Sequence, residues 1–175
     1  MVKNMNELTI LMHLLSNKQG KFHIGASKED ILEKLNLNGK YESICFEDLI
    51  TQLSSYIEPL GLQVRFNPIS STWFIAFGSE SSDFVSANPF ANKPRLASTL
   101  FYTIVCCLER HGQAKIQNIK EVRKKKHVID DLKELEQLGY IELDKNLGTV
   151  RLTPLIGYQL DLNKLIINLA LKLKK

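Results

Sequence analysis

The chain has 175 residues, of which 44% are hydrophobic, and it carries a net charge of +4. This length can bury one ordinary core or two small ones of roughly 80 residues each. The sequence has no run of about 18 uninterrupted apolar residues. Its first residues lack the basic start, apolar centre and small-residue cleavage site of a secretory signal, so we expect a soluble, cytoplasmic protein with no membrane contact.

In the first half, apolar residues recur at helical spacing in three segments. The first helix is expected within residues 6–20, and a second begins at Ser27, which is an N-cap candidate because Asp30 follows three residues later. The third helix is expected within residues 41–61. Its predicted apolar face consists of Phe46, Leu49, Ile50, Leu53, Ile57 and Leu60.

After the third helix the hydrophobic period changes from 3.6 to 2. Val64 and Phe66 alternate with polar residues, a turn follows, and Trp73, Ile75 and Phe77 share one face of the next segment. This pattern predicts a β-hairpin. Three short helices closed by a hairpin is the winged-helix arrangement, in which the hairpin is called the wing.

The stretch "GSESSDFVSANPFANKPR", residues 78–95, is rich in Ser, Gly, Asn and Pro and is typical of a linker. Beyond it the same order of three helices and a hairpin is repeated. We therefore predict a helix-rich α+β fold made of two tandem winged-helix domains. The expected boundaries are residues 1–78 for the first domain, 79–95 for the linker, and 96–175 for the second domain with an extra C-terminal helix.

The charge is distributed unequally between the two halves. Residues 1–92 have a net charge of −3, whereas residues 93–175 have a net charge of +7. Such asymmetry hints at separate domains and at an anionic partner for one of them. The basic run Arg123, Lys124, Lys125 and Lys126 supplies the candidate phosphate contacts, and the alternative is a solvated corner of the fold.

The third helix of each half is a poor candidate for reading DNA bases. In the second half, the apolar face leaves Asp130, Asp131 and Glu134 pointing outward, toward a duplex that carries one negative charge per about 1.7 Å of its axis. In the first half, the outward positions include Glu47 and Asp48 and no basic residue. Weak nonspecific contact with DNA remains compatible with the basic run.

Side chains for catalysis or metal binding are sparse. The cysteines are Cys45, Cys106 and Cys107, with no C-x-x-C spacing, and the four histidines are scattered singly. This usage suits packed thiols in a reducing compartment better than disulfides or a zinc site. No phosphate-binding glycine loop, H-E-x-x-H or G-x-S-x-G motif occurs. We expect no cofactor, no metal site and no enzymatic activity.

The C-terminal stretch "YQLDLNKLIINLALKLKK" spreads its apolar residues over more than one helix face, which favours burial on two sides. One interpretation is a helix that covers its own domain, and the other is contact with a partner or a second copy. The candidate partner or dimer contacts are Leu162, Leu165, Ile166, Ile167, Leu169 and Leu171.

Two stretches resemble a known family. "GLQVRFNPISSTWFIAF" is similar to the wing, and "RLASTLFYTIVCCLERHGQAKIQNIKEVR" to the second-domain opening, of segregation and condensation protein B (ScpB), with Lys124 in place of a family glycine. The resemblance implies a non-enzymatic homodimer that binds a kleisin (ScpA-like) subunit of an SMC condensin-like complex in chromosome condensation and segregation. The alternative function is a tandem winged-helix DNA-binding transcriptional regulator.

Overall fold

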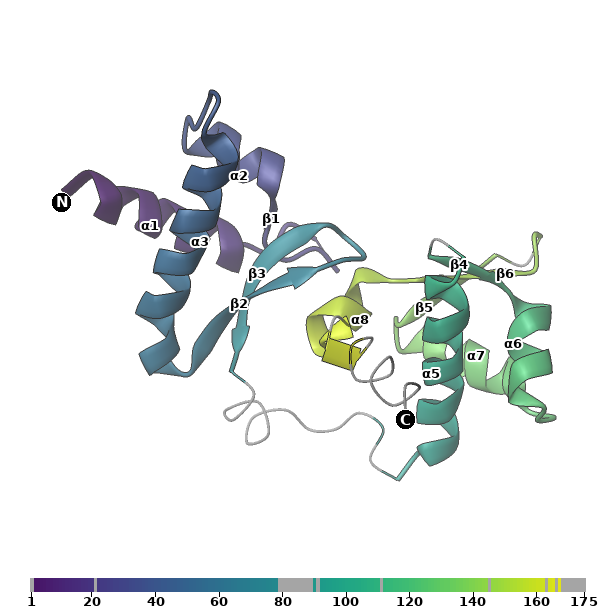
Figure 1. The fold of residues 1–175 in the computed structure, drawn as a ribbon. Helices are drawn as coiled ribbons and strands as arrows, with labels where there is room; N and C mark the ends of the chain where they lie inside the picture. The colour runs from purple at the N-terminus through teal and green to yellow at the C-terminus, as the bar shows by residue number, and fades with distance from the viewer. Residues whose placement is uncertain are drawn as a thin grey trace. The chain divides into compact units, whose positions relative to one another are not determined.

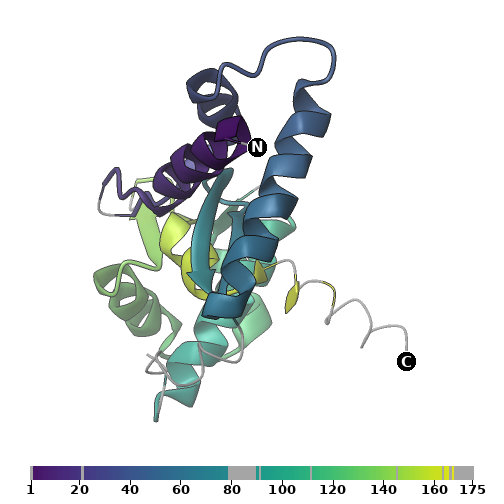
Figure 2. The same cartoon turned by 90° about the vertical axis from the view of Figure 1, so that its left-hand side faces the viewer.

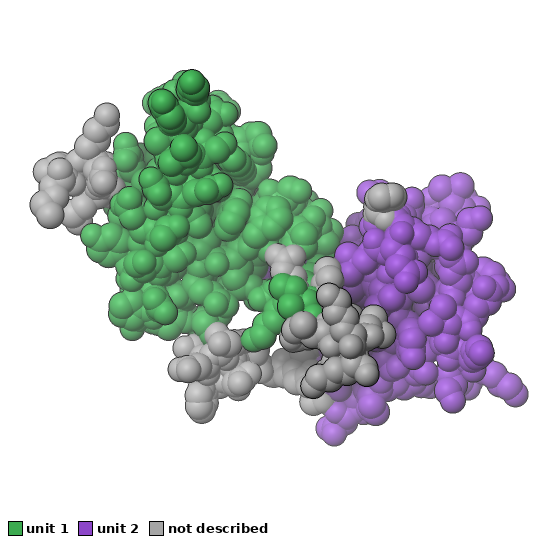
Figure 3. Space-filling view, in the orientation of Figure 1, with its two compact units in different colours: residues 1–86, 161–175 green, residues 87–160 purple. Residues whose placement is uncertain are grey.

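The computed structural model has a helix-rich α+β fold with two small three-stranded sheets (Figure 1). The chain divides into two compact units, which Figure 3 colours separately: residues 1–86 together with 161–175, and residues 87–160. The structure describes residues 2–20, 22–78, 90, 92–110, 112–144, 146–162, 164, 165 and 167.

Residues 2–78 of the first unit form three α-helices, one 3-10 helix and a three-stranded antiparallel sheet in the order β1–β3–β2. Its helix α1 packs against β3, and α3 runs alongside β2 (Figure 2). In chain order the elements are α1 (Val2–Ser16), β1 (Ala26–Ser27), α2 (Lys28–Lys34), α3 (Glu42–Ile57), the 3-10 helix η1 (Glu58–Leu60), β2 (Leu62–Asn67) and β3 (Thr72–Phe77). The expected order of helix, helix, helix and hairpin is therefore present.

The core of the first unit comes from the apolar faces of the three helices. Its buried members are Leu11, Leu15, Ala26, Ile31, Leu35, Phe46, Leu49, Leu53 and Ile57. Two residues that we expected to face inward are instead exposed, Leu60 at 73% and Phe77 at 52%. Leu60 lies in η1, where the 3-10 turn takes the chain off the face of α3, and Phe77 is the last residue of its strand.

A capping box and a glycine with a positive φ form the junction between β1 and α2. The Ser27 hydroxyl accepts a hydrogen bond from the Asp30 N–H at 3.1 Å, and the Asp30 carboxylate accepts one from the Ser27 N–H at 3.3 Å, which confirms the predicted capping box. Just before it, Gly25 has a φ of 86°. A Cβ at Gly25 would lie 1.9 Å from the Trp73 carbonyl oxygen, so only glycine allows β1 to approach β3.

The second unit repeats the order of elements with a sheet of order β4–β6–β5. Its described elements are α5 (Pro94–Leu108), β4 (Gln113–Lys115), α6 (Ile116–Arg123), α7 (Val128–Gln137), β5 (Ile141–Asp144), β6 (Thr149–Leu152) and α8 (Pro154–Gln159). The short strands β1 and β4 were not predicted, because two or three residues show no hydrophobic period.

The predicted packing of two cysteines on α5 is confirmed. Cys106 and Cys107 are buried at 5% and 0% exposure, whereas Cys45 on α3 is exposed. Burial, more than any neighbouring charge, raises the pKa of the Cys107 thiol to about 12. Both cysteines on α5 therefore behave as small apolar core residues.

The C-terminal part of the chain differs from the single helix that we expected. Helix α8 ends at Gln159, and the next residue, Leu160, has an extended backbone with a φ of −111° and a ψ of 136°. A new helical stretch then begins at Asp161, which accepts a hydrogen bond on its carbonyl from the Leu165 N–H and another on its side chain from the Lys164 N–H. The last part of the predicted helix lies outside the described residues.

The stretch that begins at Asp161 groups with the first unit, whereas we expected it to belong to the second domain. On β2 of the same unit, burial lowers the pKa of Arg65, and the negative charge of the Asp161 carboxylate partly offsets this shift. The Arg65 guanidinium also lies 5.6 Å from the ring centre of Phe74 on β3.

Candidate functional site

Helix α7 does not present all of its carboxylates to solvent. We expected Asp130, Asp131 and Glu134 to face outward, and for Asp131 that prediction is wrong, because its exposure is only 2%. Asp130 is exposed and Glu134 is half-buried, with its carboxylate 2.7 Å from the Lys93 Nζ. The apolar period alone placed Asp131 on the outer face, but polar partners on α5 bring it inside.

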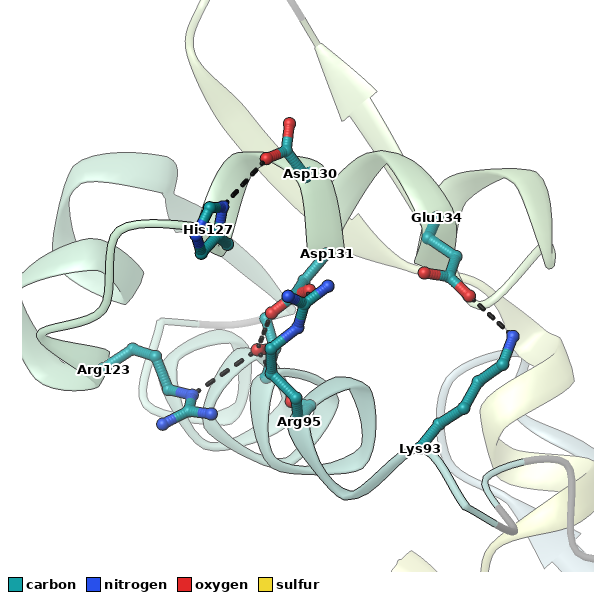
Figure 4. A network of polar contacts seen from close by, with 8 residues as sticks. Lys93, Arg95, Arg123, His127, Asp130, Asp131 and Glu134 are labelled. Carbon is teal, nitrogen blue, oxygen red and sulfur yellow. Dashed lines mark hydrogen bonds and ion pairs between the residues drawn. The ribbon is translucent and has the colours of Figure 1, made fainter.

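Asp131 is the centre of a polar network that joins α5, α6 and α7 (Figure 4). The Thr99 hydroxyl donates to Asp131 Oδ2 at 2.9 Å, and Arg95 Nε lies 2.9 Å from Oδ1. The second contact is an ion pair, and Oδ1 itself accepts no hydrogen bond in the structure. Arg123 Nε reaches the Thr99 hydroxyl at 3.5 Å. This arrangement stabilises the packing of three helices.

Within the basic run, Arg123 contacts other side chains of the protein, whereas the three lysines that follow it are exposed. The guanidinium of Arg123 is half-buried and lies 5.8 Å from the ring centre of Tyr102. Lys124 follows the last residue of α6 and has a φ of 49°, and the side chains of Lys124, Lys125 and Lys126 are exposed in the turn before α7. Phosphate contact by these four residues stays a prediction, and Arg123 already has partners within the protein.

The third helix of each unit remains poor in cationic side chains. Helix α3 contains no Lys, Arg or His and carries Glu42, Glu47 and Asp48. The fully exposed side chains of α7 are Asp130, Lys133 and Gln137, and the half-buried Glu134 and Glu136 add two carboxylates, so Lys133 is the one cationic residue of this helix. A winged helix that reads bases places such a helix against DNA phosphates, which these carboxylates would repel.

An open groove of about 610 Å³ lies between α2, α3 and the far end of the β2–β3 hairpin. Its lining residues are Lys28, Glu29, Phe46, Glu47, Ile50, Thr51, Phe66, Ser71 and Trp73. Three aromatic rings line it. The Trp73 ring centre is 5.6 Å from that of Phe46, at an interplanar angle of 70°, and 5.2 Å from that of Phe66, at 48°.

The groove was not predicted, although the sequence analysis had already singled out two of its aromatic residues on the hairpin. Phe66 and Trp73 were assigned to the two strands of the hairpin, and the register pairs them directly across these strands near the turn, where Phe66 is 36% exposed. The charged lining residues are Lys28, Glu29 and Glu47. Lys28 Nζ donates to the Ser43 hydroxyl at 3.1 Å and lies 5.2 Å from the Phe46 ring centre.

The predicted partner contacts near the C-terminus have different environments. Leu162 is 1% exposed, which fits a segment that covers its own chain. Leu165 is half-buried and Ile167 is 58% exposed. The other three candidates, Ile166, Leu169 and Leu171, lie outside the described residues, and partner contact by this set stays a prediction.

Within the described ranges, no group of three or more His, Cys, Asp or Glu side chains is arranged to hold a metal ion. Among the helices that the structure describes, none combines the length and the apolar character needed to cross a membrane.

Comparisons with known proteins identify no family for this chain. No family model matches it, and no curated protein matches it. Among solved structures, the crystal structure of ScpB from Mycobacterium tuberculosis is similar over 87% of this chain and 93% of that chain, with 13% sequence identity and a TM-score of 0.34. A likeness of this size does not establish a common fold.

Proposed function

We propose that the chain is a non-enzymatic interaction subunit built from two tandem winged-helix domains. Its proposed role resembles that of ScpB: it forms a homodimer and binds a kleisin subunit of an SMC condensin-like complex in chromosome condensation and segregation. The observation that carries the proposal is the chemistry of the two third helices. Helix α3 has no cationic side chain, and α7 has one, Lys133, against the carboxylates Asp130, Asp131, Glu134 and Glu136.

Exposed apolar side chains on the first unit support a protein partner. On α1, Ile10 and Met12 are 42% and 45% exposed, and on α3, Ile44 and Tyr56 are 58% and 67% exposed. Contiguous exposed apolar surface marks sites that bind protein, and in the proposed subunit the partner or the second copy would cover these side chains. The two phrases of the sequence that resemble ScpB, in its wing and its second-domain opening, point to the same class of partner.

DNA binding is the competing function, and the three exposed lysines before α7 favour a nonspecific form of it. The logarithm of the binding constant for a DNA duplex falls linearly with the logarithm of the salt concentration, with a slope of about −0.9 for each phosphate that the protein neutralises. If Lys124, Lys125 and Lys126 each neutralise one phosphate, replacing all three with Ala should reduce the magnitude of this slope by roughly 3. This contact with DNA would be indifferent to base sequence.

The test is co-expression of the full chain with the kleisin and SMC proteins encoded by the same genome. We expect light scattering after gel filtration to show a dimer of the chain and a stable complex with the kleisin. The triple Lys→Ala variant should keep that complex, as should the control variant Lys133→Ala on α7. Absence of a complex, together with a sequence-preferring DNA footprint that the triple variant loses, would establish the regulator function instead.

A further inference from the structure

We propose that the groove between α2, α3 and the β2–β3 hairpin binds an arginine side chain from an extended peptide segment of a partner protein. The proposal deepens the proposed function, since it rests on the partner being a protein, but it does not depend on that partner being a kleisin. The residues that carry it are Glu47, Phe66 and Trp73.

The aromatic lining is suited to a cation. The ring of Phe46 is 3% exposed and is covered on one side by Lys28, so Trp73 and Phe66 supply the accessible aromatic surface. The face of an aromatic ring attracts a cation that lies within about 6 Å of its centre. Lys28 illustrates this preference within the groove, because its ammonium group lies 5.2 Å from the Phe46 ring centre.

The charges of the lining favour the same ligand. Glu29 and Glu47 are exposed carboxylates, and Lys28 is the cation among the lining residues, so the lining has a net charge of −1. The Lys28 ammonium is held by the Ser43 hydroxyl at 3.1 Å. Because α3 adds no positive charge, a cationic side chain is attracted, whereas a phosphate or an acidic peptide is repelled.

Arginine matches this chemistry better than lysine. A planar guanidinium stacks on aromatic rings and donates two parallel hydrogen bonds to a carboxylate, and Trp73 and Glu47 bring these two kinds of partner to the lining. The groove volume of about 610 Å³ lies in the range of roughly 300–1,000 Å³ that holds small ligands, so it has room for the neighbouring side chains as well. Ile50 offers an apolar wall for such a neighbour.

The experiment uses a reporter that the chain already contains. Trp73 is the one tryptophan of the sequence, so the intrinsic tryptophan emission of the full-length protein responds to occupation of the groove. The probe is a short synthetic peptide with leucine, arginine and leucine at its centre, and its twin carries the neutral isostere citrulline in place of arginine. We expect saturable changes in emission, with the arginine peptide bound roughly tenfold more tightly.

Variants on α3 test the assigned contacts. Glu47→Gln should reduce the preference for arginine over citrulline about threefold to fivefold without changing the citrulline affinity. The matched control is Asp48→Asn, which removes the same charge from the next residue, outside the groove lining, and should leave the preference unchanged. Phe66→Leu, which keeps an apolar side chain but removes a ring, should weaken binding of the arginine peptide about twofold to fivefold.

Equal affinity for the two peptides, or equal effects of Glu47→Gln and Asp48→Asn, would overturn the proposal. A change in Trp73 emission when the protein alone is diluted from dimer to monomer would also overturn the proposal. Such a change would mean that a second copy of the chain fills the groove. These outcomes are separate from the kleisin test: loss of the arginine preference leaves a kleisin complex intact, and absence of a kleisin complex leaves the peptide titration unchanged.

Discussion

Replacing the buried carboxylate on α7 offers a direct test of the polar network in the second unit. Asp131→Ala removes the acceptor of the Thr99 hydroxyl and the ion-pair partner of Arg95. Asp131→Asn keeps an acceptor for Thr99 but removes the charge. The control is Asp130→Asn on the neighbouring residue, whose side chain is 67% exposed and lies 3.5 Å from His127 Nδ1.

The expected loss follows from the two contacts. A hydrogen bond to a charged group contributes about 1.5–3 kcal/mol to the free energy of unfolding. The Arg95 side chain is 58% exposed, so solvent screens its ion pair, which contributes about 0.2–1 kcal/mol. Thr99 can turn toward the Arg95 carbonyl at 3.1 Å, which limits the cost. We expect a loss of about 2–3 kcal/mol for Asp131→Ala, about 1–2 for Asp131→Asn, and below about 0.5 for Asp130→Asn.

The assay is urea unfolding of the full chain followed by two signals. Far-ultraviolet circular dichroism reports the helices of both units, whereas tryptophan emission reports the first unit, where Trp73 lies. A loss of about 2 kcal/mol moves the urea midpoint of the second unit by roughly 1 M. An equal effect of Asp131→Ala and Asp130→Asn, or a shift of the tryptophan transition alone, would refute the assignment of Asp131 to this network.

Four further predictions concern local structure and the thiols. Gly25→Ala should destabilise the first unit by more than about 2 kcal/mol and alter the native Trp73 emission, because the new Cβ would overlap the Trp73 carbonyl; an emission spectrum like that of the parent would contradict it. Ser27→Ala should cost about 1 kcal/mol in urea unfolding, whereas Ser27→Asp, which restores a capping oxygen, should recover most of it. In native protein, a thiol reagent should label exposed Cys45 rapidly and Cys107 only after unfolding. Folding raises the pKa of the Cys107 thiol from 9.0 to about 12, so with rising pH this thiol ionises in the unfolded chain before it ionises in the folded protein. The contribution of the Cys107 thiol to the free energy of unfolding is therefore complete below about pH 9 and falls toward pH 12. Cys107→Ala should remove this decline.

Local patterns were sufficient for much of the fold. The three helices of each unit follow from apolar residues at a 3.6-residue period, and the Ser27 capping box follows from two residues three positions apart. Both hairpins follow from the alternation of their strands. These features depend on neighbours within one or two turns of the chain, which a single sequence displays directly.

Contacts between distant residues decided the rest. Asp131 looks like a surface residue in its own helix, and it is buried because Thr99, thirty-two positions earlier, donates a hydrogen bond to it. The groove brings together Glu29, Glu47 and Trp73 from three elements, and no spacing in the sequence marks them as neighbours. Likewise, periodicity describes a helix after Asp161 but not the unit against which it packs. Helical and strand periods thus determined the elements of this protein, whereas the chemistry of its surfaces was set by tertiary packing, because that packing selects which polar groups are desolvated and paired.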